Sequence, residues 1–191
     1  PSTRASASGG IVRDRRLYPL AALYAASLGL SIVIGNWVVT LLHRDGGVDK
    51  GTAAAIGALT LALGIVTRPL GGWILHVHPA WVRRAVGSSL LAGALGTILL
   101  LAASPAAAAV GAVLVGLAAG IPFAPAFTGA ALTRPDAQAA AVGFVNGAAS
   151  VVVLVGTPLV GITFSLPGGG RTGFAVVAAL WEDLRTTKKS S

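Results

Sequence analysis

The chain has 191 residues, of which 54% are apolar and only 10% are charged. Soluble domains carry about 25% charged residues, whereas apolar blocks of about 18 or more residues are typical of membrane-spanning helices. The composition therefore excludes an ordinary soluble domain, and the blocks predict an all-α membrane bundle of about six transmembrane helices.

The formal net charge is +8, and the basic residues lie at the ends of the apolar blocks. No basic stripe alternates with aromatic residues, so we interpret the charge as cationic helix flanks and expect no nucleic-acid partner. The chain lacks cysteine and shows no Ser/His/Asp group, carboxylate pair or phosphate-binding loop. We therefore expect neither an enzyme nor a bound cofactor.

Residues 1–16 are predicted to be a flexible cytoplasmic linker, because the opening PSTRASASGG is small and polar. The chain begins with Pro1, and we expect it to be a fragment of a longer protein or a processed product. The basic flank and apolar run that follow resemble a signal peptide. The run of about 26 residues exceeds the 7–15 of a signal core, so we predict a retained helix.

Five apolar blocks are each long enough to cross about 30 Å of hydrocarbon. They cover about residues 17–42, 52–75, 85–103, 106–132 and 137–166. A sixth piece, 172–181, extends only about 15 Å, which predicts a short or truncated last helix. The predicted membrane bundle is 17–181, and 182–191 form a polar cytoplasmic tail.

Basic residues are concentrated in three places along the chain. These are the N-terminal flank with Arg13, Arg15 and Arg16, the second loop with Arg83 and Arg84, and the tail with Lys188 and Lys189. By the positive-inside rule these segments are cytoplasmic. Six crossings of the cell membrane, with both termini inside, satisfy this rule.

Glycines and prolines indicate how the helices pack. Two glycine pairs have the small-xxx-small spacing that permits close helix contact, with a transport hinge as the alternative. The pairs are Gly116 with Gly120, and Gly143 with Gly147. Pro122 and Pro125 predict a kink in the fourth span, which we expect to face an aqueous cavity.

Three stretches resemble the major facilitator superfamily of transporters. RPLGGWILHVHPAWVRR, residues 68–84, resembles the loop after the second helix of each half. GLAAGIPFAPAF, 116–127, and AVGFVNGAASVVVLVGTPLVG, 141–161, resemble the fourth and fifth helices of the second half. The resemblance covers nearly the whole chain after the linker. It implies the C-terminal six-helix half of a secondary transporter, whose partner is the missing N-terminal half.

The resemblance implies roles for particular residues. A conformational latch and loop would comprise Arg68, Gly71, Gly72, Arg83 and Arg84. In this reading Arg68 braces the cytoplasmic corner at the membrane edge, the glycine pair forms its turn and permits close helix packing, and Arg83 and Arg84 set topology. Snorkelling is the alternative for Arg68. His76 departs from the family, which usually has an acid at this position.

The family's first, second, fourth and fifth helices of a half line the solute cavity. On that basis the substrate-cavity candidates are Asn36, Thr60, Phe123, Phe127, Asn146 and Ser150. Interhelical hydrogen bonding is the alternative for the two asparagines. A loose similarity to nitrate/cyanate-type carriers implies a small, anionic solute. No acidic residue lies within a span, so proton coupling belongs to the missing half, or transport is uniport or exchange, or the solute carries the charge.

Neither candidate metal motif is complete. His76 and His78 form a His-x-His without a third ligand, and Asp45 and Asp49 are too few carboxylates for a calcium loop. We therefore expect no metal. Two other functions remain open for the chain. One is a small membrane scaffold or assembly subunit that acts by helix packing with a partner, and the other is a pore-forming oligomer.

Overall fold

The computed structural model describes residues 10–102 and 104–187, with side chains as far as Asp183, and contains no strand in this part. The predicted all-α class is confirmed there. The first rod, Arg15–Asp45, joins a 3₁₀ turn, α2 (Tyr18–Tyr24), a π turn (Ala25–Leu30), α3 (Ser31–Thr40) and a second π turn (Leu41–Asp45). The others are α4 (Lys50–Val77), α5 (Val82–Leu100), α6 (Pro105–Gly120), α7 (Phe123–Thr133), α8 (Gln138–Thr163) and α9 (Gly170–Thr187).

Four helices in the described part are long and apolar enough to cross a membrane. They are Arg15–Asp45, Lys50–Val77, Pro105–Thr133 and Gln138–Thr163. Arg83 and Arg84 lie in the first turn of α5, and α9 continues past its apolar piece through Glu182 and Asp183. The last helix is therefore longer than the apolar run 172–181. The expected tail begins inside α9 and ends, at 188–191, outside the described residues.

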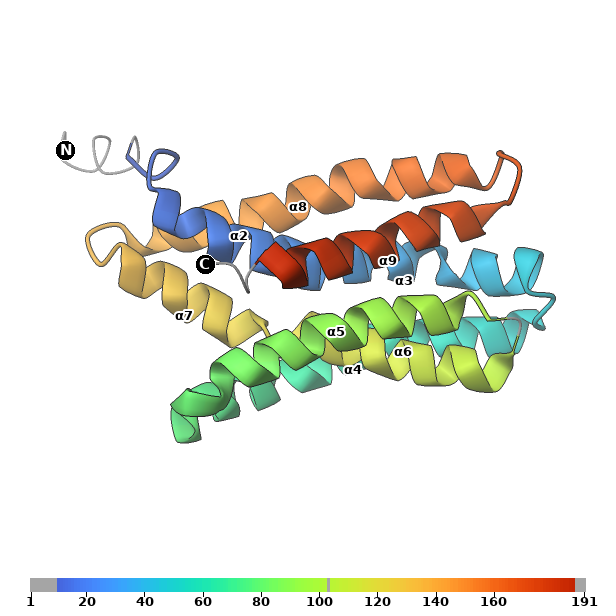
Figure 1. Ribbon diagram of the computed structural model, residues 1–191, viewed down its shortest axis with the longest axis horizontal. Helices are drawn as coiled ribbons and strands as arrows, with labels where there is room; N and C mark the ends of the chain where they lie inside the picture. Colours follow the sequence, from blue (N-terminus) through green and yellow to red (C-terminus); the bar gives the residue numbers. More distant parts are fainter. Residues whose placement is uncertain (1–9, 103, 188–191) are drawn as a thin grey trace.

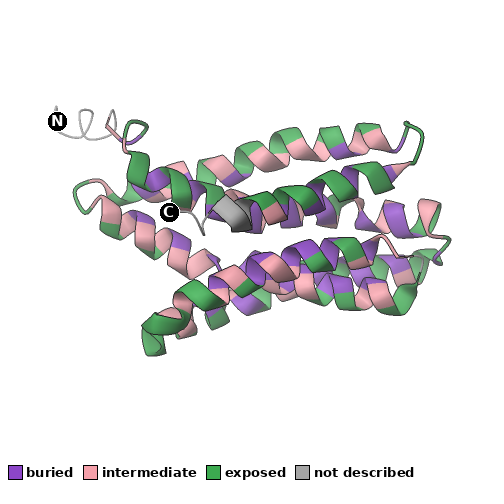
Figure 2. Ribbon diagram, viewed as in Figure 1, coloured by how far each residue is buried: buried purple, intermediate pink, exposed green. Residues whose placement is uncertain are grey.

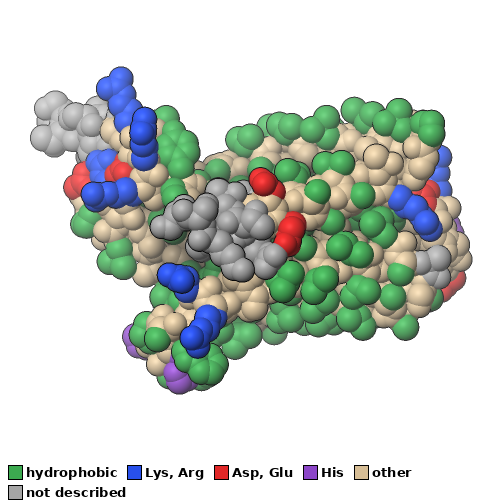
Figure 3. Space-filling model, viewed as in Figure 1, with side chains coloured by type: hydrophobic (Ala, Val, Ile, Leu, Met, Phe, Trp, Pro, Cys, Tyr) green, Lys and Arg blue, Asp and Glu red, His purple; other side chains and the backbone are tan. Residues whose placement is uncertain are grey.

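The rods lie side by side along the long axis of the molecule (Figure 1). The N-terminal segment, the turn between α4 and α5 and the α7–α8 loop lie at one end, which we call the basic end. Apart from residues 182–191, it carries Arg13, Arg15, Arg16, Arg83, Arg84 and Arg134 against Asp14 and Asp136. The opposite end carries Arg44, Lys50 and Arg171 against Asp45 and Asp49. Most charged side chains gather near the two ends in Figure 3, acidic ones also lie near the middle of this face, and hydrophobic ones are spread over the surface between the ends.

Side-chain carboxylates fix the start of two helices. Asp49 accepts hydrogen bonds from the backbone N–H groups of Gly51 and Thr52 at 2.9 and 3.1 Å, which caps α4. Hydrogen bonds from Thr52 hold the pKa of Asp49 below its usual value. Asp45 accepts from the Gly170 N–H at 2.8 Å and so ties the end of the first rod to the start of α9.

The α7–α8 loop is braced by Arg134 at the basic end. Its guanidinium donates to both carboxylate oxygens of Asp136 at 2.9 and 2.7 Å and lies 3.9 Å from Asp14. The pair lowers the pKa of Asp136 and raises the pKa of Arg134, mainly through the hydrogen bonds between them. The contact joins the loop to the N-terminal segment, which is described only from residue 10.

Close helix packing centres on α6. A Cβ on Gly116 would lie 2.5 Å from the Cβ of Leu63, and one on Gly120 would collide with Thr67. The Thr67 hydroxyl donates to the Leu63 carbonyl at 2.7 Å and the Gly116 carbonyl at 3.0 Å. The first glycine pair therefore lies in the α4–α6 contact, as its spacing predicts.

The second glycine pair behaves differently from the first. A Cβ on Gly143 or Gly147 would meet nothing within 4 Å among the described residues, and both glycines are exposed on α8. The helix contact expected from their spacing is not made within this chain. Figure 2 shows much of α8 as exposed or intermediate.

The turn expected at Gly71 and Gly72 also requires correction. Both glycines lie inside α4, which continues to Val77, and the chain turns at His78 and the 3₁₀ turn Pro79–Trp81. The expectation of close packing fits Gly71, since its Cβ would collide with the Ile121 carbonyl. A Cβ on Gly72 would lie 3.8 Å from the Cβ of Ala124, an ordinary contact.

We predict that Gly71→Ala destabilises the chain and that Gly72→Ala does not. The added methyl at 71 must displace backbone, and overpacking of this kind costs about 1–3 kcal/mol. At 72 the methyl fits, and alanine has the higher helix propensity. Thermal unfolding of the detergent-solubilised variants measures the difference, and equal midpoints would contradict the backbone contact.

Candidate functional site

Arg68 is a cationic residue within a helix rather than in a loop. From Arg68, α4 continues to Val77, about 14 Å at 1.5 Å per residue. The whole helix is about 42 Å long, so a centred α4 places Arg68 about 8 Å inside a 30 Å hydrocarbon layer. In that placement Arg68 lies about one and a half helical turns inside the hydrocarbon boundary.

The Arg68 guanidinium stacks on an aromatic ring. Its Cζ lies 4.9 Å from the centroid of Phe123, which is a cation–π distance. The buried Nε of Arg68 has no hydrogen-bond partner, and both salt bridges found among the described residues involve Arg134. A ring contact engages the face of the guanidinium and supplies no acceptor for the N–H donors at its edge.

Tyr24 and Phe127 complete an aromatic wall beside Arg68. The Tyr24 ring centroid lies 4.6 Å from that of Phe127 and 6.0 Å from that of Phe123, and the two phenylalanines are 4.6 Å apart. We call Tyr24, Arg68, Phe123 and Phe127 the Arg68 cluster.

The backbone break between α6 and α7 positions this cluster. α6 ends at Gly120, Ile121 and Pro122 form the break, and α7 begins at Phe123. This is the kink expected from the prolines, and it divides the fourth predicted span. Gly71 lies against Ile121, so Arg68, almost one helical turn earlier on α4, lies next to Phe123.

The structure brings together only part of the predicted cavity set. Phe123 and Phe127 belong to the Arg68 cluster. Thr60 is 2% exposed, and its hydroxyl donates to the Ile56 carbonyl at 3.1 Å. A Cβ on Gly116 would lie 3.2 Å from the Thr60 carbonyl, so Thr60 lies in the α4–α6 contact and lines no open space in this structure.

Asn36 lies near the other end of the first rod and bonds to α8. Its amide donates to the Thr157 hydroxyl at 3.2 Å, and the neighbouring Trp37 indole donates to the Thr157 carbonyl at 2.8 Å. A Cβ on Gly161 would lie 2.5 Å from the Trp37 ring. Asn36 therefore makes the interhelical bond weighed in the sequence analysis, while its side chain remains exposed.

One face of α8 is exposed and carries small and polar residues. Gly143, Asn146, Gly147 and Ser150 recur at intervals of three or four residues, so they share a helix face, which we call the α8 stripe. The Ser150 hydroxyl donates to the Asn146 carbonyl at 3.1 Å. Within the described part of the chain, no interhelical hydrogen bond involves Asn146.

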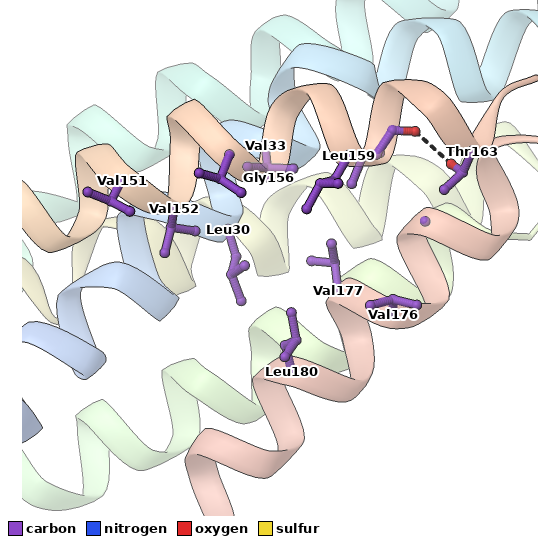
Figure 4. A pocket seen from close by; sticks show the side chains of 13 residues that line it. Leu30, Val33, Val151, Val152, Gly156, Leu159, Thr163, Val176, Val177 and Leu180 are labelled. Atoms are coloured by element: carbon purple, nitrogen blue, oxygen red, sulfur yellow. Dashed lines mark hydrogen bonds between the residues drawn. The ribbon is translucent and has the colours of Figure 1, made fainter.

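A separate cavity of about 390 Å³ lies between α8 and α9 beside the first rod (Figure 4). Its walls are almost entirely apolar, with Leu30, Val155, Leu159, Val177 and Leu180 among them. No ionisable residue lines it. The cavity therefore offers no recognition of a polar solute.

The corner residues and the candidate ligands lie at the molecular ends. Arg83 and Arg84 are exposed in the first turn of α5, and His76 is exposed on the last turn of α4. No cluster of three or more His, Cys, Asp or Glu side chains suited to a metal is found in the described segments.

Sequence reasoning did not identify Tyr24. Arg68 already lay within the second predicted block, which continues past Pro69 to Leu75. The sequence showed only that Tyr24 lies in the first apolar block. That position does not distinguish a residue that lines a cavity from one that is buried in the core.

The chain matches no protein-family model and no curated protein.

We predict that the two faces of α8 meet different solvents in the membrane. The chain has no cysteine, so single cysteines report on one position each. Ser150→Cys on the stripe should react with a charged, membrane-impermeant thiol reagent at least about tenfold faster than Leu159→Cys, because only water sustains the reactive thiolate. Val145→Cys, at a buried position of α8, is the control for a protein-covered site. Equal rates at positions 150 and 159 would contradict an aqueous stripe.

Proposed function

We propose that the chain is the C-terminal six-helix half of a major-facilitator-type secondary transporter and moves a small anion by alternating access. The observation that carries this proposal is the Arg68 cluster. Within the described part of the chain Arg68 makes no salt bridge, its buried Nε has no hydrogen-bond partner, and its guanidinium lies over the ring of Phe123 on an apolar helix long enough to cross a membrane. Intramembrane charges are costly and typical of functional sites.

The cluster has the chemistry for binding a small anion. The free edge of the Arg68 guanidinium can donate charge-assisted hydrogen bonds, which replace part of the water around an anion. Phe123 holds the guanidinium plane, and Tyr24 and Phe127 form the adjoining aromatic wall. In this role Arg68 contacts the solute directly, so the function differs from the latch implied by the family resemblance.

The α8 stripe supports a second six-helix half as the partner. Exposed Asn146 and Ser150 at membrane depth are unfavourable against lipid and favourable against a water-filled space. A solute path between two halves would be bounded by this face of α8 on one side. The basic end would be cytoplasmic in this arrangement, because it has the excess of arginine.

A membrane scaffold is the second candidate function. The observation in its favour is the exposed apolar surface of α8, which includes Val151, Leu154, Val155 and Leu159. Under this alternative, alanine at Asn36 and Asn146 would alter partner association without affecting transport. Under the transporter proposal, the same changes would reduce flux after assembly with a first half, and the chain alone would insert without transporting solute.

We predict that nitrate binding depends on Arg68. Nitrate, compared with the bulky anion gluconate at equal ionic strength, should raise the thermal unfolding midpoint of the detergent-solubilised chain, because a ligand that binds the folded state stabilises it. Arg68→Gln should remove this shift, since loss of a charged hydrogen bond costs about 1.5–3 kcal/mol, tenfold or more in affinity. Arg68→Lys should retain a smaller shift because lysine lacks the planar fork.

Arg16→Gln is the matched control for the nitrate experiment. It removes one positive charge from the basic end and leaves the Arg68 cluster intact. A nitrate shift that persists in Arg68→Gln, or that disappears equally in Arg16→Gln, would contradict the proposed site.

A further inference from the structure

The corner between α4 and α5 projects at the basic end of the bundle (Figure 1). If α4 is centred in the hydrocarbon, Trp73 lies about 6 Å from its end and therefore at the lipid–water boundary. The chain then passes through His78 and the turn Pro79–Trp81 before α5 begins. In that placement the corner from Trp73 to Arg84 lies at the level of lipid headgroups.

Exposed aromatic rings form an ordered group on this corner. The His78 ring centroid lies 5.3 Å from that of Trp73 and 5.9 Å from that of Trp81. The indoles are 54% and 63% exposed, respectively, although tryptophan is a large apolar residue. Ring contacts hold the two indoles in place while leaving most of their surface open. Amphipathic indole rings are enriched at the membrane interface.

The charges of the corner have a single sign. Residues 73–84 contain His76, His78, Arg83 and Arg84 and no acid. The two arginines are exposed in the first turn of α5, where the helix dipole disfavours a positive charge. No hydrogen bond or salt bridge to either arginine is found among the described residues. An external anionic surface would offset this placement.

We propose that the α4–α5 corner binds anionic phospholipid headgroups, with Arg83 and Arg84 contacting phosphate and Trp73 and Trp81 seated at the interface. Charge complementarity favours this partner, since the corner combines two permanent positive charges with two exposed indoles at headgroup depth. The role goes beyond setting topology, because it requires selective contact with anionic lipid after insertion. It does not depend on which solute the Arg68 cluster binds.

Fluorescence quenching by brominated lipids tests the proposal. The 191-residue chain is reconstituted into phosphatidylcholine vesicles that contain an equal share of brominated phosphatidylglycerol or of brominated phosphatidylcholine. The variant Trp73→Phe/Trp81→Phe gives the signal of the other two tryptophans, and subtraction leaves that of the corner. The expected result is stronger quenching of the corner by the anionic lipid than by the zwitterionic one.

Substitution of Arg83 and Arg84 tests whether these residues cause the stronger quenching by anionic lipid. Each basic residue near a membrane surface contributes about fivefold to the affinity for anionic lipid, so Arg83→Gln/Arg84→Gln should reduce the preference by at least that factor. Arg83→Lys/Arg84→Lys should retain most of it. Both leaflets of these vesicles have the same lipid composition, so both ends of the bundle meet the same lipids. A change of topology alone therefore does not alter the measured quenching.

The matched control is Arg15→Gln/Arg16→Gln, which removes the same charge elsewhere on the basic end. Retention of the preference in this variant, together with its loss in Arg83→Gln/Arg84→Gln, supports a local site. Equal quenching by both lipids, a preference that survives the loss of Arg83 and Arg84, or an equal loss in the control pair would overturn the proposal.

Discussion

Backbone contact between α4 and the α6–α7 rod determines the geometry on which the rest of the molecule depends. Gly116, Gly120 and Gly71 occur in succession along this contact, and each lies where a side chain would collide with the opposing helix. In lipid there is no hydrophobic driving force between helices, so close van der Waals packing of this kind carries much of the association. The register of α4 against Phe123 is fixed by the same contact. The position of Arg68 beside Phe123 is therefore a consequence of the close packing at these glycines.

The unpaired guanidinium nitrogen of Arg68 is energetically unfavourable, and this cost bears on the function of the residue. A buried guanidinium nitrogen without a partner is unfavourable, and contact with Phe123 offsets only part of this, about 0.5–2 kcal/mol for a cation–π pair. Substitution by an apolar residue would remove the penalty. The arrangement is physically reasonable if another group satisfies the guanidinium for part of the time, and a small anion has the charge and acceptors to do so.

The sequence predicted the helical class and the approximate limits of the long helices, because these follow from hydropathy and length. It predicted the packing of Gly116 and Gly120 and the break near Pro122 for similarly local reasons. It did not locate the turn after the second helix, because Gly71 and Gly72 permit either a turn or close packing, and only the position of Ile121 decides between them. Thr60 was assigned to the cavity because the sequence shows which helix it belongs to. The sequence does not show which way that helix is rotated, and therefore which of its faces lies against α6.

The two glycine pairs show what a spacing rule contains and what it lacks. Gly116 and Gly120 have apolar neighbours such as Val115 and Leu117, whereas Gly143 and Gly147 flank Asn146, and Ser150 follows Gly147 by about one turn. Both pairs present a smooth helix face, but a polar neighbourhood makes that face unsuited to the dry interior of a single bundle. The small-xxx-small pattern therefore indicates a helix face that another helix can approach closely. The polarity of the neighbouring residues determines whether that helix belongs to the core of the same bundle. On this reasoning the α8 stripe faces water or a partner, which is the arrangement that the proposed two-half transporter requires.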